Sequence, residues 1–182
     1  MKKLLLLIPA TLLALVGCKP EPKAKLPEFN GASTSLTPAN STVTTTDKNN
    51  PTTTSTFVDL EIPDSPETYR VEIGAGCYLK TTSGGYQEII LKPGSYIKSV
   101  SKYTVDRLVI DYFSKQGENH SVYANNKGTG SKVDSHISEI PATEPDDFGK
   151  VLEYPINSNG WMIKNETEFN NPALYYVTIC LV

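Results

Sequence analysis

Short runs of β-branched and aromatic residues, separated by turn residues, recur along the chain from Phe57 to the last residue. A Ser83-Gly84-Gly85 turn between two of the runs is typical of a β-hairpin. No stretch of the same length has helical periodicity. The pattern predicts an all-β fold over residues 57–182, an antiparallel β-sandwich or a small barrel. The predicted strands are Phe57–Ile62, Tyr69–Ile73, Cys77–Thr82, Tyr86–Leu91, Tyr96–Val100, Val105–Phe113, Ser121–Ala124, Val151–Ile156, Gly160–Lys164 and Leu174–Val182.

Alternation within two runs predicts which of their faces are buried. Leu108, Ile110 and Tyr112 share one face of their strand, which we expect to be buried. The last run is apolar on both faces, which favours a central strand covered on both sides. The polar stretch Ser131–Gly149 predicts a loop. A domain of this length is large enough to bury a core of its own.

The segment before this domain has a different composition. Residues 19–56 are rich in Pro, Thr, Ser, Asn and Lys and hold few apolar side chains, so we expect a disordered tether. A flexible chain of this length has a root-mean-square span of roughly 35 Å. Fully stretched, it reaches more than about 100 Å.

The first residues predict an export signal. Met1-Lys2-Lys3 is a basic start, and the apolar stretch from Leu4 to Ala14 is too short to span a bilayer comfortably. Residues 1–17 therefore form the predicted signal peptide. The motif that follows, Leu15-Val16-Gly17-Cys18, resembles the lipobox of bacterial lipoproteins.

That resemblance implies a lipid anchor without a transmembrane helix. The Cys18 thiol would carry a diacylglycerol and its amine a further acyl chain such as palmitate, and stable anchoring requires more than one chain. The next residue is Lys19 rather than Asp. This favours the outer membrane, with the periplasmic or exterior face left open.

Charge limits the partners of the domain. The whole chain has a net charge of −3, and residues 57–182 hold 11 Lys and Arg against 17 Asp and Glu, a balance of −6. Such a surface repels nucleic acids. We expect a protein or glycan of the cell envelope as the partner.

The remaining cysteines, Cys77 and Cys180, form a pair in an oxidising compartment. We expect a disulfide between them, which would close a loop of about a hundred residues. The alternative is a free nucleophilic thiol. Neither cysteine has a neighbouring histidine in the sequence, and the apolar strand around Cys180 would raise its pKa.

Few residues in the sequence carry recognisable chemistry. The chain has two histidines, His120 and His136, and neither has a second ligand at the usual metal-site spacing. A nucleophile turn of the Gly-x-Ser-x-Gly type is absent from the sequence. We therefore expect no metal, no cofactor and no catalytic residue.

Aromatic residues are the candidate contact groups. Trp161 stands among asparagines, a mixture found in carbohydrate sites, although a core tryptophan beside turn asparagines is the alternative. We expect Trp161, Tyr175 and Tyr176 to contribute to a binding surface. Residues 94–96, 105–112 and Gly117 resemble the strand repeat of jacalin-related lectins, which implies an antiparallel sheet.

Three functions agree with these features. The first is a noncatalytic binding or assembly module, such as an accessory lipoprotein of a secretion or surface apparatus. The second is a lectin-like glycan binder that uses Tyr and Trp faces. The third is a small envelope hydrolase that would depend on His120 or His136.

Overall fold

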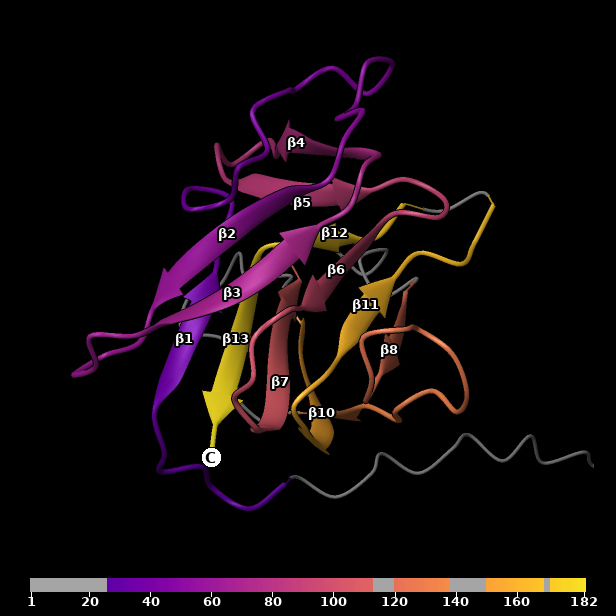
Figure 1. Ribbon diagram of the computed structural model, residues 1–182. Coiled ribbons are helices and arrows are strands. Elements are labelled where there is room, and N and C mark those ends of the chain that lie inside the picture. The colour runs from indigo at the N-terminus through magenta and orange to yellow at the C-terminus, as the bar shows by residue number, and fades with distance from the viewer. Residues whose placement is uncertain (1–25, 113–119, 138–149, 169–170) are drawn as a thin grey trace, which may run out of the picture.

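Figure 1 shows the computed structural model, which describes residues 26–112, 120–137, 150–168 and 171–182. Within these ranges every helix or strand is a β-strand, and the strands form three antiparallel sheets. Sheet A has the order β1(Ser33–Leu36), β13(Tyr176–Leu181), β7(Val105–Tyr112), β10(Lys150–Ser158) and β9(His136–Ile137). Sheet B has the order β2(Thr56–Glu61), β3(Thr68–Ile73), β6(Tyr96–Ser99), β11(Met162–Lys164) and β8(Ser121–Tyr123). Sheet C has the order β12(Ala173–Leu174), β5(Gln87–Leu91) and β4(Cys77–Thr81).

The fold is a β-sandwich, as the sequence pattern predicts. Sheet B lies in front of sheet A in Figure 1, and sheet C lies across one end of the two. One continuous cluster of buried side chains comes from the inner faces of sheets A and B and from one face of sheet C. Burial of this apolar area is the main force that holds the layers together.

The ten predicted strands all correspond to strands of the structure, with bounds shifted by one to two residues in most cases. The last predicted run is divided at Tyr175 into β12 and β13. The Ser83-Gly84-Gly85 turn joins β4 to β5, and Gly85 has a φ of 85°, which glycine adopts without strain. Leu108 and Ile110 are fully buried, as the alternation predicts.

The expectation that a disordered tether extends to Thr56 is wrong. β1 lies within that segment and pairs with β13 along the edge of sheet A. Leu36 is 0% exposed and Val43 is 3% exposed, so this segment contributes to the core. Composition alone missed the strand because its hydrogen bonds come from the edge of a distant strand rather than from its own apolar content. The tether predicted for residues 18–25 lies outside the described residues.

β13 extends from one end of the sandwich to the other. It starts close to sheet C and ends at the opposite end of the sandwich, beside the C-terminus (Figure 1). β1 is antiparallel to it, with Ser33 opposite Cys180 and Leu36 opposite Val177. The chain therefore enters at the end where β13 finishes and proceeds toward sheet C.

Candidate functional site

Trp161 belongs to the core and not to a binding surface. Its side chain is 0% exposed, and its Nε1 donates a hydrogen bond of 2.9 Å to the hydroxyl oxygen of Tyr69. The expectation of a contact role for Trp161 is therefore wrong, and the core alternative is correct. Of the asparagines near it in the sequence, Asn157 belongs to β10, and Asn165 is itself fully buried and donates to the carbonyl of Leu91 at 2.9 Å.

The other two predicted contact residues do lie at the surface and meet a third tyrosine. Tyr176 is 38% exposed and Tyr86 is 48% exposed, while Tyr175 is half-buried between them. The ring centroids of Tyr175 and Tyr176 are 4.3 Å apart with an interplanar angle of 81°. Those of Tyr175 and Tyr86 are 6.0 Å apart at the same angle. Both outer rings thus stand edge-on to the central ring, a favourable arrangement for aromatic pairs.

These rings line an open groove with a volume of about 380 Å³, which we call the tyrosine groove. It combines three segments that are distant in the sequence: the turn after β1, the β4–β5 hairpin and the β12–β13 junction. None of its lining residues carries a formal charge. They are Thr37, Pro38, Ala39, Thr81, Gly85, Tyr86, Gln87, Tyr175 and Tyr176.

Local hydrogen bonds explain how each segment reaches the groove. The backbone N of Thr37 donates to Asn40 Oδ1 at 2.8 Å, which shapes the turn that carries Pro38. In the hairpin, the backbone N of Thr82 donates to the carbonyl of Tyr86 at 2.7 Å. These hydrogen bonds fix the backbone of the two turns that contribute Pro38 and Tyr86 to the groove.

The chemistry of the groove is that of contact and hydrogen bonding. Burial, followed by the hydrogen bond with Tyr176, raises the pKa of Tyr175 to about 12, so its phenol stays protonated at neutral pH. The side chains of Thr81 and Gln87 are exposed and offer a hydroxyl and an amide. Such a surface can receive a neutral ligand with apolar faces and polar edges.

Sequence analysis finds Tyr175 and Tyr176 but misses Tyr86 and Pro38. Tyr86 follows the glycine turn of a predicted hairpin, a position where an aromatic side chain projects from the surface. That placement was a usable signal. Pro38 carried no such signal, because its segment was expected to be disordered.

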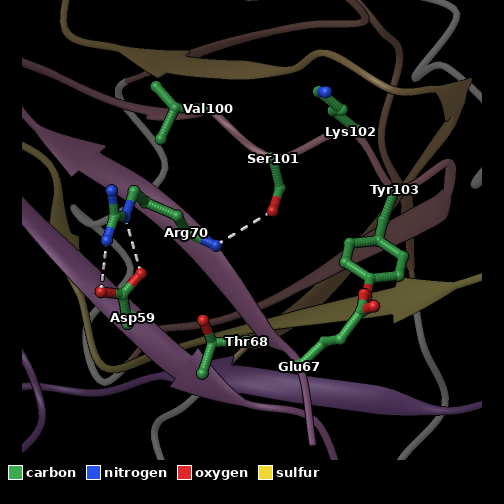
Figure 2. Close-up of a pocket in the computed structure, with 8 residues that line it drawn as sticks. All are labelled: Asp59, Glu67, Thr68, Arg70, Val100, Ser101, Lys102 and Tyr103. Carbon is green, nitrogen blue, oxygen red and sulfur yellow. Dashed lines mark hydrogen bonds and ion pairs between the residues drawn. The ribbon is translucent and has the colours of Figure 1, made fainter. Parts of the chain in front are cut away.

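A second groove, of about 530 Å³, is lined by residues of β2, of β3 and of the loop after β6 (Figure 2). Asp59 and Arg70 face each other across β2 and β3, and the guanidinium makes two hydrogen bonds of 2.7 Å to the carboxylate. The Arg70 hydrogen bond lowers the pKa of Asp59. Ser101 accepts a hydrogen bond of 3.1 Å from the Arg70 backbone N and so holds the loop after β6 against β3. Within this groove, the charges of Asp59 and Arg70 therefore neutralise one another.

The expected disulfide between Cys77 and Cys180 is absent, because each thiol is buried and free. Cys77 belongs to the core cluster on sheet C, whereas Cys180 alternates with core residues of β13 and so faces the outer side of sheet A. Burial raises the pKa of Cys77 to about 12 and that of Cys180 to about 11, so both thiols are protonated at neutral pH. An even number of cysteines predicted a pair, but their placement on different layers separates them.

The two histidines occupy different surroundings. His120 Nε2 lies 2.7 Å from the hydroxyl oxygen of Tyr112 and 3.3 Å from that of Tyr154, whereas His136 is part of β9 and pairs with Glu153. Among the described residues no group of three His, Cys, Asp or Glu side chains is arranged to hold a metal ion. The structure does not bring the two histidines together into one site.

The lipid anchor expected at Cys18 lies outside the described residues. In the part of the chain that the structure describes, no helix is long and apolar enough to cross a membrane. No protein-family model matches the chain, and no curated protein or solved structure is significantly similar to it. The function is therefore proposed from the sequence features, the fold and the tyrosine groove.

Proposed function

We propose that the protein is a noncatalytic binding or assembly module of the bacterial cell envelope, anchored to the outer membrane through lipid on Cys18. The observation that carries the binding role is the tyrosine groove. Three tyrosines from two distant segments, the β4–β5 hairpin and the β12–β13 junction, gather there at the surface, although aromatic side chains are often buried. Tyrosine offers a large rigid contact area at little entropic cost, which is why binding surfaces are enriched in it.

The anchoring role rests on the lipobox and on the composition before the domain. Leu15-Val16-Gly17-Cys18 follows a basic and apolar leader, and Lys19 replaces the aspartate that would favour the inner membrane. A protein with this anchor would carry its domain beside the membrane. Its partner is then a protein or a glycan of the envelope.

Metabolic labelling with a palmitate analogue tests the anchor. The wild-type chain should carry the label and sediment with membranes, and Cys18→Ser should lose both properties. Cys77→Ser is the matched control, because that thiol is buried in the core and should not affect labelling. Label that persists in Cys18→Ser would contradict the lipoprotein assignment.

A second candidate function is favoured by the uncharged lining of the tyrosine groove. A saccharide has apolar ring faces and hydroxyl edges, which correspond to tyrosine rings flanked by the amide of Gln87 and the hydroxyl of Thr81. This chemistry supports a lectin-like module for neutral glycans. Anionic glycans find no cationic side chain in the groove.

A glycan array followed by calorimetry separates the two candidates. A lectin-like module should bind neutral oligosaccharides, with at least about tenfold weaker affinity for Tyr176→Ala or Tyr86→Ala. Phe57→Ala is the matched control, because Phe57 is an exposed aromatic residue of β2 that does not line the groove. If only envelope proteins bind, and the tyrosine variants abolish that binding, the groove is a protein contact surface. If neither tyrosine variant changes any binding, the groove has no such role.

A further inference from the structure

The chain before β1 is held on the outer face of sheet A by a buried arginine. Arg107 is 8% exposed, and its Nη1 donates a hydrogen bond of 2.7 Å to the carbonyl oxygen of Pro27. Its guanidinium carbon lies 5.7 Å from the ring centroid of Phe29, within the range of a cation–π interaction. Asp106 and Glu153 accept hydrogen bonds from the same guanidinium at 2.6 and 3.3 Å.

Gly31, two residues after Phe29, is also closely packed. A Cβ at Gly31 would collide with the ring of Phe29 and would lie 2.9 Å from the carbonyl oxygen of Leu181. The backbone N of Leu181 donates to the carbonyl of Ala32 at 2.8 Å, so the segment leads directly into the β1–β13 pairing. We call residues 26–31 the latch.

Exposure along the outer face of β13 is lowest beside the latch. Cys180, the cross-strand neighbour of Arg107, is 4% exposed, whereas Tyr176 on the same face is 38% exposed. Side chains on an outer sheet face are buried only where something covers them. Arg107, the cross-strand neighbour of Cys180, contacts Pro27 and Phe29, so the latch lies next to this part of the face.

The latch and the tyrosine groove lie at opposite ends of the sandwich. The latch meets Leu181 at the end of β13, and Tyr176 lines the groove at its beginning. A strand of six residues separates them, which corresponds to roughly 17–20 Å. Figure 1 shows the entering chain beside the C-terminus, with sheet C at the far end.

We propose that the latch fixes the membrane-facing surface of the domain: the end that carries the latch faces the bilayer, and the tyrosine groove faces away from it. This inference rests on the lipid anchor proposed at Cys18. Eight residue steps separate Cys18 from Leu26, so the anchor can be at most roughly 29 Å from the latch. A tether running to Thr56 would instead allow free rotation of the domain. The short connection keeps the groove turned toward partners outside the membrane plane.

Thiol reactivity in the soluble Cys18→Ser chain tests the latch without the lipid. Gly31→Val should displace the latch through its collision with Phe29, and Cys180 should then react with a thiol reagent at least about tenfold faster than in the parent. Cys77 reports on the core and should remain unreactive. Asn30→Val is the matched control, because Asn30 is an exposed neighbour of Gly31, and it should leave the Cys180 rate unchanged.

Two results would overturn the latch. An unchanged Cys180 rate in Gly31→Val would show that residues 26–31 do not cover this thiol. If Gly31→Val also exposes Cys77, the core has opened, and Phe29→Ala is then measured by the same criterion. Phe29→Ala removes the ring under Arg107 without adding bulk, so an unchanged Cys180 rate in that variant would overturn the proposal.

Energy transfer in vesicles tests the orientation of the lipidated chain. A dye is attached to Lys102→Cys at the latch end or to Lys48→Cys at the sheet C end, with the acceptor on a lipid of phosphatidylethanolamine–phosphatidylglycerol vesicles. Both lysines are exposed; Lys102 lies in the loop where Thr104 accepts a hydrogen bond from the backbone N of Val182. The Lys102→Cys dye should be quenched more strongly than the Lys48→Cys dye.

The outcomes separate this inference from the anchor itself. Equal quenching, or stronger quenching at position 48, in a vesicle-bound chain would overturn the orientation and leave the anchor intact. Failure to bind vesicles together with absence of palmitate label would overturn the anchor, and with it the orientation. The thiol result on the soluble chain would remain valid for the latch.

Discussion

The indole nitrogen of Trp161 donates a 2.9 Å hydrogen bond to the hydroxyl of Tyr69 in the interior of the sandwich. The Tyr69 hydroxyl donates in turn to Ser99 Oγ at 2.9 Å, and Ser99 donates to the carbonyl of Asn159 at 3.2 Å. This chain of hydrogen bonds connects three strands or loops through the core of sheet B. Each buried donor has an acceptor, so the polar atoms do not weaken the core.

We predict that Trp161→Ala destabilises the domain by about 3–5 kcal/mol, because it leaves a large cavity in the core. Tyr69→Phe should cost less, about 1–3 kcal/mol, since it leaves no cavity and removes only the hydroxyl that accepts from the indole and donates to Ser99. Urea unfolding followed by circular dichroism measures both changes. Tyr176→Ala, at the surface, should stay within about 0.5 kcal/mol of the parent. A Trp161→Ala domain as stable as the parent would contradict the core assignment.

A second prediction concerns the first strand. A chain shortened to residues 57–182 loses β1 together with the buried side chains of Leu36 and Val43. If each contributes about 1.5–3 kcal/mol, the shortened chain should be about 3–6 kcal/mol less stable. Urea unfolding monitored by the fluorescence of Trp161 measures the difference.

A chain that begins at Leu26 is the control for that truncation. It retains β1, so its unfolding midpoint should match that of the full-length Cys18→Ser chain. Equal unfolding midpoints for the chains starting at 26 and 57 would show that β1 contributes nothing to the fold.

The third prediction concerns the two buried thiols. The intact mass of the purified protein should be the same with and without reductant, because Cys77 and Cys180 are free. Alkylation at neutral pH should be slow in the folded state, since burial raises the pKa of both thiols, and complete after unfolding. A mass increase of two hydrogens on reduction would indicate a disulfide instead.

The fourth prediction concerns acid stability. Glu166 accepts hydrogen bonds from Lys132 at 2.8 Å, Tyr123 at 2.7 Å and Ser121 at 2.8 Å. The hydrogen bond from Lys132, followed by that from Tyr123, lowers the pKa of Glu166 from its ordinary value of 4.5 to about 2. Because the folded pKa is below the unfolded one, the carboxylate stabilises the fold above pH 4.5, and this stability is lost as the pH falls toward 2. Unfolding free energies measured across this range should therefore fall with pH.

Glu166→Gln should make that decline shallower, because the amide does not titrate. Some slope should remain, since Asp59 and Glu72 also have lowered pKa values. Glu67→Gln is the control, because Glu67 is exposed and takes no part in the hydrogen bonds to Glu166. This variant should leave the decline of the unfolding free energy unchanged. An unchanged slope in Glu166→Gln would contradict the role of Glu166.

The sequence alone determined the β architecture and most of its strands. Strand formation depends on local features, namely alternating side chains and turn residues, and these can be recognised without the partner strands. The hairpin at Gly85 and the buried face of Leu108 and Ile110 were predictable for this reason. Tyr175 and Tyr176 were also predicted as surface contacts, although not the groove around them.

Tertiary structure decided which residues meet. Trp161 was ambiguous in sequence because an indole among asparagines suits a core or a surface, and only the position of Tyr69 and the opposite sheet resolves it. β1 depended on the edge of β13, and Cys77 and Cys180 lie on different layers of the sandwich. These relationships are non-local: they follow from how sheets pack across long sequence separations, which composition and local periodicity do not encode.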